Sequence, residues 1–171
     1  KKRDLLELTD KTASIIGYGS LGSEVAKRLK AFGVKVIGVG RREKESEYLD
    51  EYLLIDDIDL AIKQSDIIIL SLPLTEETRK LINKDKIDKM KDKALLINVS
   101  RGGLIDEREL IRALNKGKFL GVALDVFEEE PLQESELWDM KNVIITPHNS
   151  FVSDKINDRL FKLIVNNLYF K

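Results

Sequence analysis

The sequence contains no cysteine and only three prolines, and aromatic residues make up 6% of it. Without cysteine there can be no disulfide bond and no thiolate metal site, and we expect no bound metal. No apolar run approaches the roughly 20 residues needed to cross a membrane, and the amino terminus lacks the charged and then apolar pattern of a signal peptide. These absences favour a cytoplasmic protein without a membrane partner.

Neither sign of charge is in excess. Lysine and arginine number 29 against 30 aspartates and glutamates, which gives a net charge of −1. Because the chain is not strongly basic, we expect no nucleic-acid partner. The chain has 171 residues and is 43% hydrophobic, which is enough for one buried core. We therefore interpret residues 1–171 as a single domain.

Short aliphatic runs alternate with segments of helical spacing. The runs are ASIIG (13–17), KVIGV (35–39), DIIILSL (66–72), ALLINV (94–99), FLGVALDV (119–126) and NVIITP (142–147). In the segment after the first run, Leu21, Val25, Leu29 and Phe32 predict a helix with an apolar stripe facing a sheet. The alternation predicts an α/β fold, a doubly wound parallel sheet of about six strands with helices on both faces. Residues 43–59 show no clean period.

A glycine motif lies between the first strand and the first helix. Gly17, Gly19 and Gly22 have the spacing GxGxxG, which in this context is typical of Rossmann dinucleotide-binding domains. Gly17 permits the tight turn, Gly19 lets the backbone approach a diphosphate, and Gly22 lets the helix pack on the strand. The N–H groups of Ser20 and Leu21 would then face the ligand at the positive end of the helix. The alternative is that the glycines serve only the turn.

The end of the second strand lacks the usual acidic residue. About twenty residues after the glycine motif, that acid binds both ribose hydroxyls of NAD. This chain has Gly40 followed by Arg41 and Arg42. Gly40 has no carboxylate to repel a 2'-phosphate, and the two guanidinium groups could pair with it through charge-assisted hydrogen bonds. The pattern favours NADP(H), unless both arginines are solvated loop charges.

Three polar residues follow later strands. Arg101 comes after the fourth predicted strand, Glu130 after the fifth and His148, the single histidine, after the sixth. Taken singly, each has an ordinary explanation as a surface charge or a structural hydrogen-bonding group. Because the carboxyl ends of parallel strands meet at one edge of a sheet, we expect all three to lie on the edge that carries the glycine motif.

Five ordered blocks of sequence are similar to one known family. The blocks are GYGSLG (17–22), SLPLTEETRKLIN (71–83), NVSRGGLIDERELIRAL (98–114), GVALDVFEEEPL (121–132) and TPH (146–148). From about Leu8 to Ser150 the chain resembles the nucleotide-binding domain of the D-isomer-specific 2-hydroxyacid dehydrogenases. That family includes phosphoglycerate, glycerate and D-lactate dehydrogenases and glyoxylate/hydroxypyruvate reductases. The resemblance implies an oxidoreductase that transfers a hydride between NAD(P) and a small D-2-hydroxy acid or 2-oxo acid.

The resemblance also implies roles for single residues. Arg101 would bind the substrate carboxylate and polarise its carbonyl group, His148 would act as the acid and base, and Glu130 would hydrogen-bond the imidazole. Asp125 would contact the nicotinamide carboxamide, with Arg101 and His148 beside the ring. The remaining residues that would line the cofactor are Leu72, Pro73, Thr78, Val99 and Ser100.

The chain departs from the family pattern at its ends. The family's substrate domain is formed by flanking segments that are absent from residues 1–171, so we expect a piece of a longer, homodimeric protein. Because the cleft of the isolated fragment would have only one wall, we expect turnover of the complete protein and not of the fragment alone. The sequence also predicts a final helix with apolar residues on almost every side. Such a helix must be covered, either by a missing segment or a partner subunit, or by its own domain. Its apolar residues are Ile156, Leu160, Phe161, Leu163, Ile164, Val165, Leu168, Tyr169 and Phe170.

Two other functions remain open from the sequence. Some members of the resembling family are transcriptional corepressors that sense dinucleotides and keep the same catalytic-looking residues. The chain could also be a structural fragment that binds no cofactor. Saturable binding of NADPH or NADH would exclude the structural fragment, whereas turnover of a 2-oxo acid would distinguish the enzyme from the sensor.

Overall fold

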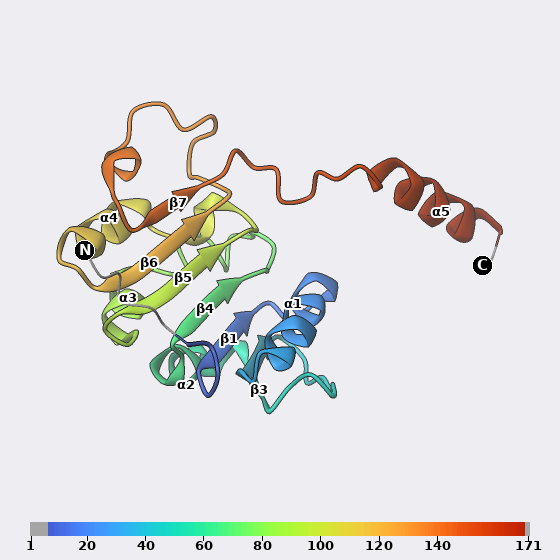
Figure 1. Cartoon of the computed structure of the whole chain (residues 1–171), viewed down its shortest axis with the longest axis horizontal. Helices are drawn as coiled ribbons and strands as arrows, with labels where there is room; N and C mark the ends of the chain where they lie inside the picture. The colour runs from blue at the N-terminus through green and yellow to red at the C-terminus, as the bar shows by residue number, and fades with distance from the viewer. Residues whose placement is uncertain (1–6, 170–171) are drawn as a thin grey trace.

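The computed structural model describes residues 7–169 and contains one parallel sheet of seven strands in the order β3-β2-β1-β4-β5-β6-β7 (Figure 1). The strands are β1 (Thr12–Ile16), β2 (Lys35–Gly40), β3 (Glu51–Leu54), β4 (Ile67–Leu70), β5 (Ala94–Asn98), β6 (Phe119–Leu124) and β7 (Val143–Ile145). The helices are α1 (Ser20–Ala31), α2 (Ile58–Gln64), α3 (Lys84–Lys89), α4 (Glu107–Asn115) and α5 (Ile156–Tyr169), with short 3-10 turns η1 (Ile55–Asp57), η2 (Gly102–Leu104) and η3 (Glu136–Asp139). The predicted doubly wound parallel sheet is confirmed.

Helices pack on both faces of the sheet, as predicted. On one face α2, α3 and α4 contribute apolar residues such as Ile62, Ile87 and Leu110 to a core with β4, β5 and β6. On the other face α1 packs Ala26 against Ile15 and Ile69 of the central strands. The central strands are buried on both sides, which explains their continuous aliphatic runs. Within residues 7–169, no helix has the length and apolarity that a bilayer span requires.

The sheet has one strand more than the six predicted. β3 lies in the segment 43–59, pairs with β2 and forms the edge of the sheet. Its sequence is EYLL, and none of its residues is fully buried. An edge strand of four residues needs no continuous apolar run, so its pattern did not stand out.

The apolar stripe predicted for α1 was partly wrong. Gly22 and Ala26 are the fully buried residues of the helix, with Val25 and Leu29 packed beside them. Leu21 and Phe32, at the two ends of the predicted stripe, are 52% and 62% exposed. The helix therefore contacts the sheet through small residues, which bring its first turn close to the strand ends.

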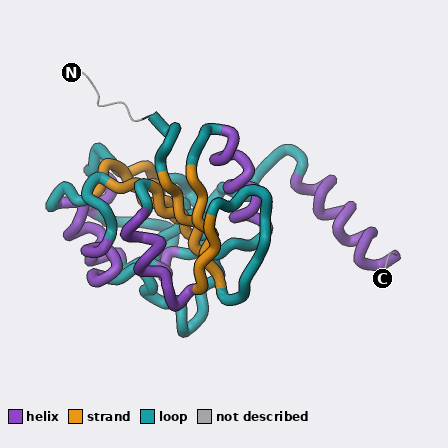
Figure 2. The backbone as a smooth tube through the Cα atoms, turned by 90° about the horizontal axis from the view of Figure 1, so that it is seen from below, coloured by secondary structure: helices purple, strands orange, loops and turns teal. Residues whose placement is uncertain are grey.

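The final helix stands away from the domain. Figures 1 and 2 both show α5 at the end of an extended segment, without contact with the sheet. It has no buried residue, and Leu160, Phe161 and Leu163 are each more than half exposed. Of the two interpretations that the sequence left open for this helix, burial on its own domain is therefore wrong for the described residues. Phe170, the last apolar residue of the predicted helix, lies outside the described residues.

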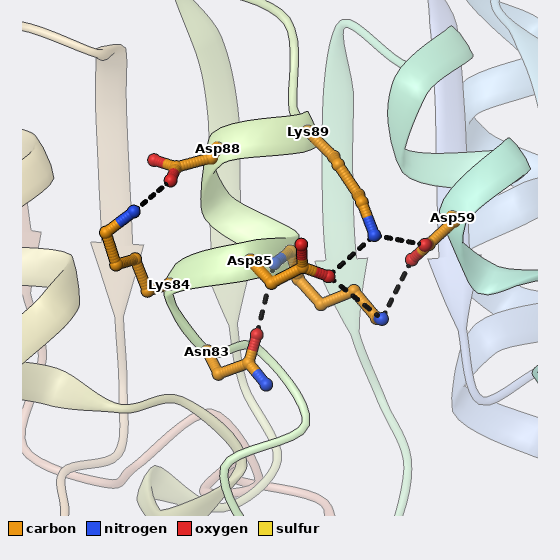
Figure 3. Close-up of polar contacts among 7 residues, drawn as sticks. Asp59, Asn83, Lys84, Asp85, Asp88 and Lys89 are labelled. Carbon is orange, nitrogen blue, oxygen red and sulfur yellow. Dashed lines mark hydrogen bonds and ion pairs between the residues drawn. The ribbon is translucent and has the colours of Figure 1, made fainter.

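Ion pairs join α2 to α3 on the outer surface (Figure 3). Asp59 of α2 forms ion pairs with Lys86 Nζ at 2.9 Å and Lys89 Nζ at 2.6 Å, and Lys89 also pairs with Asp85 at 2.6 Å. Asn83 caps α3, because its Oδ1 accepts the backbone N–H of Lys86 at 3.1 Å. Hydrogen bonds from Lys89 and Lys86 lower the pKa of Asp59, so this carboxylate stays charged over a wide pH range.

Candidate active site

All the candidate site residues lie at one edge of the sheet. Every strand pairing is parallel, so the carboxyl ends of the strands point the same way. The strand order reverses between β1 and β4, and this switch point is where open α/β sheets bind ligands. The glycine turn follows β1, whereas Arg101, Glu130 and His148 follow β5, β6 and β7. The sequence therefore predicted correctly which edge carries these residues.

Two glycines of the turn are required by close packing within the protein, whereas the third is not. Gly17 has a φ of +98°, and a Cβ there would lie 2.6 Å from Leu72 Cβ, so no other residue fits without strain. Gly22 packs against the chain in the same way, with a Cβ position 2.9 Å from the Gly17 carbonyl oxygen. Gly19, in contrast, has no atom of the described residues within 4 Å of its Cβ position. The protein itself does not need a glycine at position 19, which leaves the space for a ligand.

The amino terminus of α1 opens onto this space. Gly19 precedes the helix without a side-chain cap, and the first turn contains no acidic residue. The side chains of Ser20 and Leu21 are exposed. Uncapped N–H groups at the positive end of a helix suit the diphosphate of a dinucleotide. The residues present therefore fit the cofactor that the sequence predicts.

Hydrogen bonds connect the ends of β1, β4 and β5. Ser71 Oγ donates to the Gly17 carbonyl at 2.8 Å, and Ser100 Oγ donates to the Leu72 carbonyl. Thr78 Oγ1 donates to the Pro73 carbonyl at 2.9 Å and so closes the turn after β4. These contacts hold Leu72, Pro73, Thr78 and Ser100, together with half-buried Val99, along the edge next to the glycine turn.

Arg101 is positioned by its backbone. Asn98, fully buried at the end of β5, donates from Nδ2 to the Arg101 carbonyl at 2.9 Å and accepts the Ser100 N–H at 3.1 Å. A Cβ at Gly102 would lie 1.9 Å from the carbonyl carbon of Phe127, so this loop packs directly on the segment after β6. The guanidinium is exposed and donates to the Ser100 carbonyl at 2.7 Å. Among residues 7–169 it forms no ion pair with a carboxylate, and it is accessible to an anion.

Glu130 and His148 are in direct contact. Glu130 Oε2 lies 2.6 Å from His148 Nδ1, and Glu130 Oε1 accepts the Phe127 N–H at 3.0 Å. The two side chains are 34% and 38% exposed, so the imidazole has one nitrogen held by the carboxylate while the ring reaches solvent. Burial alone would raise the pKa of Glu130, but the hydrogen bonds from His148 and Phe127 outweigh it and the pKa is lowered. The carboxylate is therefore charged beside the ring.

Asp125 holds the loop that carries His148. This carboxylate is 3% exposed and accepts hydrogen bonds from Thr146 Oγ1 at 2.5 Å, Asn149 N–H at 3.1 Å and Ser150 N–H at 2.9 Å. His148 itself has a φ of +51°, a left-handed conformation that costs about 1–2 kcal/mol for a residue with a side chain. The bonds to the residues on either side stabilise that conformation. A carboxylate offers about four lone pairs, so a further donor can still be accepted.

Three cations lie after β2, where the sequence predicted two. Arg41 and Arg42 are exposed, and Lys44 reaches back to the glycine turn, where its Nζ donates to the Tyr18 carbonyl at 3.0 Å. Lys44 was missed because its position depends on how residues 43–50 fold over the turn. The signal present in the sequence was the continuation of the cationic run, RREK.

Comparison with known proteins places the chain in one family. The family model described as "D-isomer specific 2-hydroxyacid dehydrogenase, NAD binding domain" matches residues 1–150. A glyoxylate reductase of Thermococcus litoralis is 41% identical over 164 residues, which cover 94% of this chain and 49% of that protein. A hydroxypyruvate reductase of Thermotoga maritima is 44% identical over 145 residues, which cover 83% of this chain and 46% of that protein.

A solved structure agrees with these sequence relatives. The NADPH-dependent glyoxylate/hydroxypyruvate reductase of Sinorhizobium meliloti, in complex with NADP and sulfate, has a TM-score of 0.88 and 34% identity, covering 99% of this chain and 56% of that one. The chain spans about half the length of the curated relatives it matches. On its sequence and its fold, the chain belongs to the D-isomer-specific 2-hydroxyacid dehydrogenase family, as an NAD-binding domain.

Proposed function

We propose that this domain binds NAD(P) and that the protein to which it belongs transfers a hydride between the nicotinamide and a small D-2-hydroxy acid or 2-oxo acid. The observation that carries the proposal is the Glu130–His148 pair on the edge that also holds the open glycine turn. The glyoxylate and hydroxypyruvate reductases among the relatives support a small 2-oxo acid as substrate. Homodimerisation and a cytoplasmic location stay predictions for the longer protein.

The cofactor would lie across the switch point of the sheet. Its diphosphate would bind the N–H groups of Ser20 and Leu21, next to the Gly19 Cβ position, which has no atom of residues 7–169 within 4 Å. Leu72, Pro73, Thr78, Val99 and Ser100 would line the path toward β5, and Asp125 would accept a hydrogen bond from the carboxamide. When bound, the cofactor supplies or accepts the hydride.

The protein's own residues would handle charge and protons. Arg101 would bind the substrate carboxylate through two parallel hydrogen bonds, which fixes the 2-oxo carbon in one orientation. Negative charge that develops on the carbonyl oxygen during reduction would be neutralised by a proton from His148. General acid help of this kind accelerates a reaction by about 100-fold to 10,000-fold. Glu130 would hold the imidazole through Nδ1, so that the other nitrogen faces the substrate.

The cations after β2 favour NADP(H) in this proposal. Gly40 offers no carboxylate, and Arg41 and Arg42 are free to pair with a 2'-phosphate, with Lys44 beside the glycine turn as a third positive charge. Two structural relatives, from Sinorhizobium meliloti and Xanthobacter autotrophicus, are described in complex with NADP and NADPH respectively. These observations support a preference for NADP(H) over NAD(H).

Fluorescence titration of NADPH and NADH against the complete protein tests the proposal. We expect saturable binding of both, with NADPH tighter. Replacing Arg41 and Arg42 with alanine should weaken NADPH by about tenfold to a hundredfold, the effect of losing hydrogen bonds to a charged group, and should change NADH much less. Arg28→Ala removes an exposed guanidinium in the last turn of α1 and serves as the control.

The possible outcomes separate the alternatives. If neither dinucleotide saturates, the enzyme and the dinucleotide sensor are both refuted. Equal losses for the two cofactors would show that the arginines do not read the phosphate. Binding without turnover across a panel of 2-oxo acids that includes glyoxylate and hydroxypyruvate would favour a dinucleotide-sensing module.

A further inference from the structure

A tyrosine ring lies along the end of β2 and fills the space beside its two glycines. Gly38 and Gly40 alternate along the strand, so they face the same side as Tyr52 of the adjacent β3. A Cβ at Gly38 would meet Tyr52 Cδ2 at 3.0 Å, and a Cβ at Gly40 would meet the Tyr52 hydroxyl oxygen at 2.3 Å. Neither glycine has a φ in the left-handed region. Tyr52, not the backbone conformation, is what requires glycine at position 40.

The tyrosine is fixed in this place by several contacts. Its hydroxyl donates to the Arg42 carbonyl at 2.6 Å, and its ring packs edge to face against Tyr18 with centroids 6.3 Å apart. Tyr18 is buried and donates from its own hydroxyl to Ser46 Oγ at 2.7 Å. Burial raises the pKa of Tyr52, so its hydroxyl stays protonated and remains a donor. The ring cannot move away without disturbing this cluster.

Position 40 is where a dinucleotide-binding domain normally has its ribose-binding acid. The geometry points to Tyr52 as a specificity-determining residue: its hydroxyl occupies the place of that acid's side chain and binds the backbone that carries Arg41 and Arg42. This inference rests on the proposed dinucleotide binding. Tyr52, twelve positions after Gly40, is then the residue that excludes an NAD-type carboxylate from position 40.

Two consequences follow from the contacts. A carboxylate introduced at position 40 alone has no room, because its first side-chain carbon would already overlap the hydroxyl. The next atom of Tyr52, Cζ, lies at an ordinary contact distance of 3.5 Å from the same Cβ position. Tyr52→Phe therefore removes the obstructing atom and keeps the ring. It also frees the Arg42 carbonyl, which loosens the segment that holds the two guanidinium groups.

A double-mutant cycle in the complete protein tests the inference. The variants are Gly40→Ala, Gly40→Asp, Tyr52→Phe and the two double variants, each measured by thermal unfolding and by NADPH and NADH titration. Gly40→Ala should lower Tm with Tyr52 present and lower it clearly less with Tyr52→Phe. Gly40→Asp should shift the ratio of NADH to NADPH affinity toward NADH at least about tenfold more in the Tyr52→Phe background. Tyr48→Phe, a partly buried tyrosine that does not contact Gly40, is the control and should give additive effects.

Each outcome decides the inference. Equal Tm losses for Gly40→Ala in the two backgrounds would overturn the steric role of Tyr52. An equal shift in cofactor ratio for Gly40→Asp in both backgrounds would overturn its role in specificity. If Gly40→Asp fails to fold even with Tyr52→Phe, the carboxylate is excluded by something other than the hydroxyl, which also overturns it. If neither the wild-type protein nor any variant binds either dinucleotide, the proposed function fails. Non-additive Tm changes for positions 40 and 52 would in that case still show that the Tyr52 hydroxyl blocks a side chain at position 40.

Discussion

Replacing Asp125 with asparagine tests how the histidine loop is held. The carboxylate is 3% exposed and accepts hydrogen bonds from Thr146, Asn149 and Ser150. In Asp125→Asn one of the two oxygens becomes an NH₂ group, which donates hydrogen bonds and would face donors of the loop. We expect a less stable domain and a displaced loop, and hence weaker binding of the dinucleotide.

The size of the effect follows from the titration of this group. Burial alone would raise the pKa of Asp125, but the hydrogen bonds from Thr146, Ser150 and Asn149 lower it from 3.8 to about 2. Because the folded-state pKa lies below the unfolded value, the charged group stabilises the fold above about pH 4, and this contribution is lost as the pH falls through about 2. Each pKa unit corresponds to about 1.4 kcal/mol, so the contribution at neutral pH is about 2 kcal/mol.

Urea unfolding between pH 7 and pH 2.5 provides the assay. The wild-type protein should exceed Asp125→Asn in free energy of unfolding by about 2 kcal/mol at pH 7, and the gap should narrow steadily below about pH 5. Asp139→Asn, which changes an exposed carboxylate, is the control and should leave the free energy nearly unchanged. A gap that does not depend on pH would refute the reasoning, because the stabilisation would then not come from the charged form.

Three further predictions concern the reaction, the glycine turn and the surface. In the complete protein His148→Ala should lower turnover by about 100-fold to 10,000-fold with little change in cofactor affinity, and steady-state kinetics that show undiminished turnover would assign the proton to another group. Gly17→Ala should lower Tm markedly, whereas Gly19→Ala should keep Tm and weaken dinucleotide binding; a normal titration for Gly19→Ala would mean that the open space is not the diphosphate site. Asp59→Asn should lower Tm at low salt and much less in about 1 M NaCl, where surface charges are screened, and a salt-independent loss in thermal scans would contradict an electrostatic origin.

The sequence was sufficient to predict the sheet because most of its strands are buried. β1 and β4 are covered on both faces, and such strands appear as continuous aliphatic runs that stand out without any structural information. β3 was missed because an exposed edge strand has no such pattern. The orientation of α5 was also not predictable, because its apolar residues indicate only that something covers a helix of this kind.

The sequence was sufficient to predict which strand end carries each candidate site residue, but not the contacts that these residues make. Parallel topology alone places residues that follow β5, β6 and β7 on one edge, which is why Arg101, Glu130 and His148 could be grouped from their positions. The contacts that depend on tertiary packing were not predictable. Lys44 lies in the irregular segment after β2 and reaches the glycine turn through the Tyr18 carbonyl, and Tyr52 lies beside the end of β2 because β3 pairs with it.

The segment after β6 places the histidine through two carboxylates with separate tasks. Asp125 is buried and accepts hydrogen bonds from the Thr146 hydroxyl before His148 and from the Asn149 and Ser150 N–H groups after it, so it sets where His148 lies and maintains its left-handed conformation. Glu130 is partly exposed and binds Nδ1, so it sets how the ring is oriented and which nitrogen remains available. Both groups have a lowered pKa and carry their charge at neutral pH, so neither competes with the imidazole for a proton there. Backbone position and proton transfer are therefore controlled by different side chains, and a change at Glu130 should alter turnover and lower stability less than a change at Asp125, because Glu130 is partly exposed and accepts two hydrogen bonds where Asp125 accepts three.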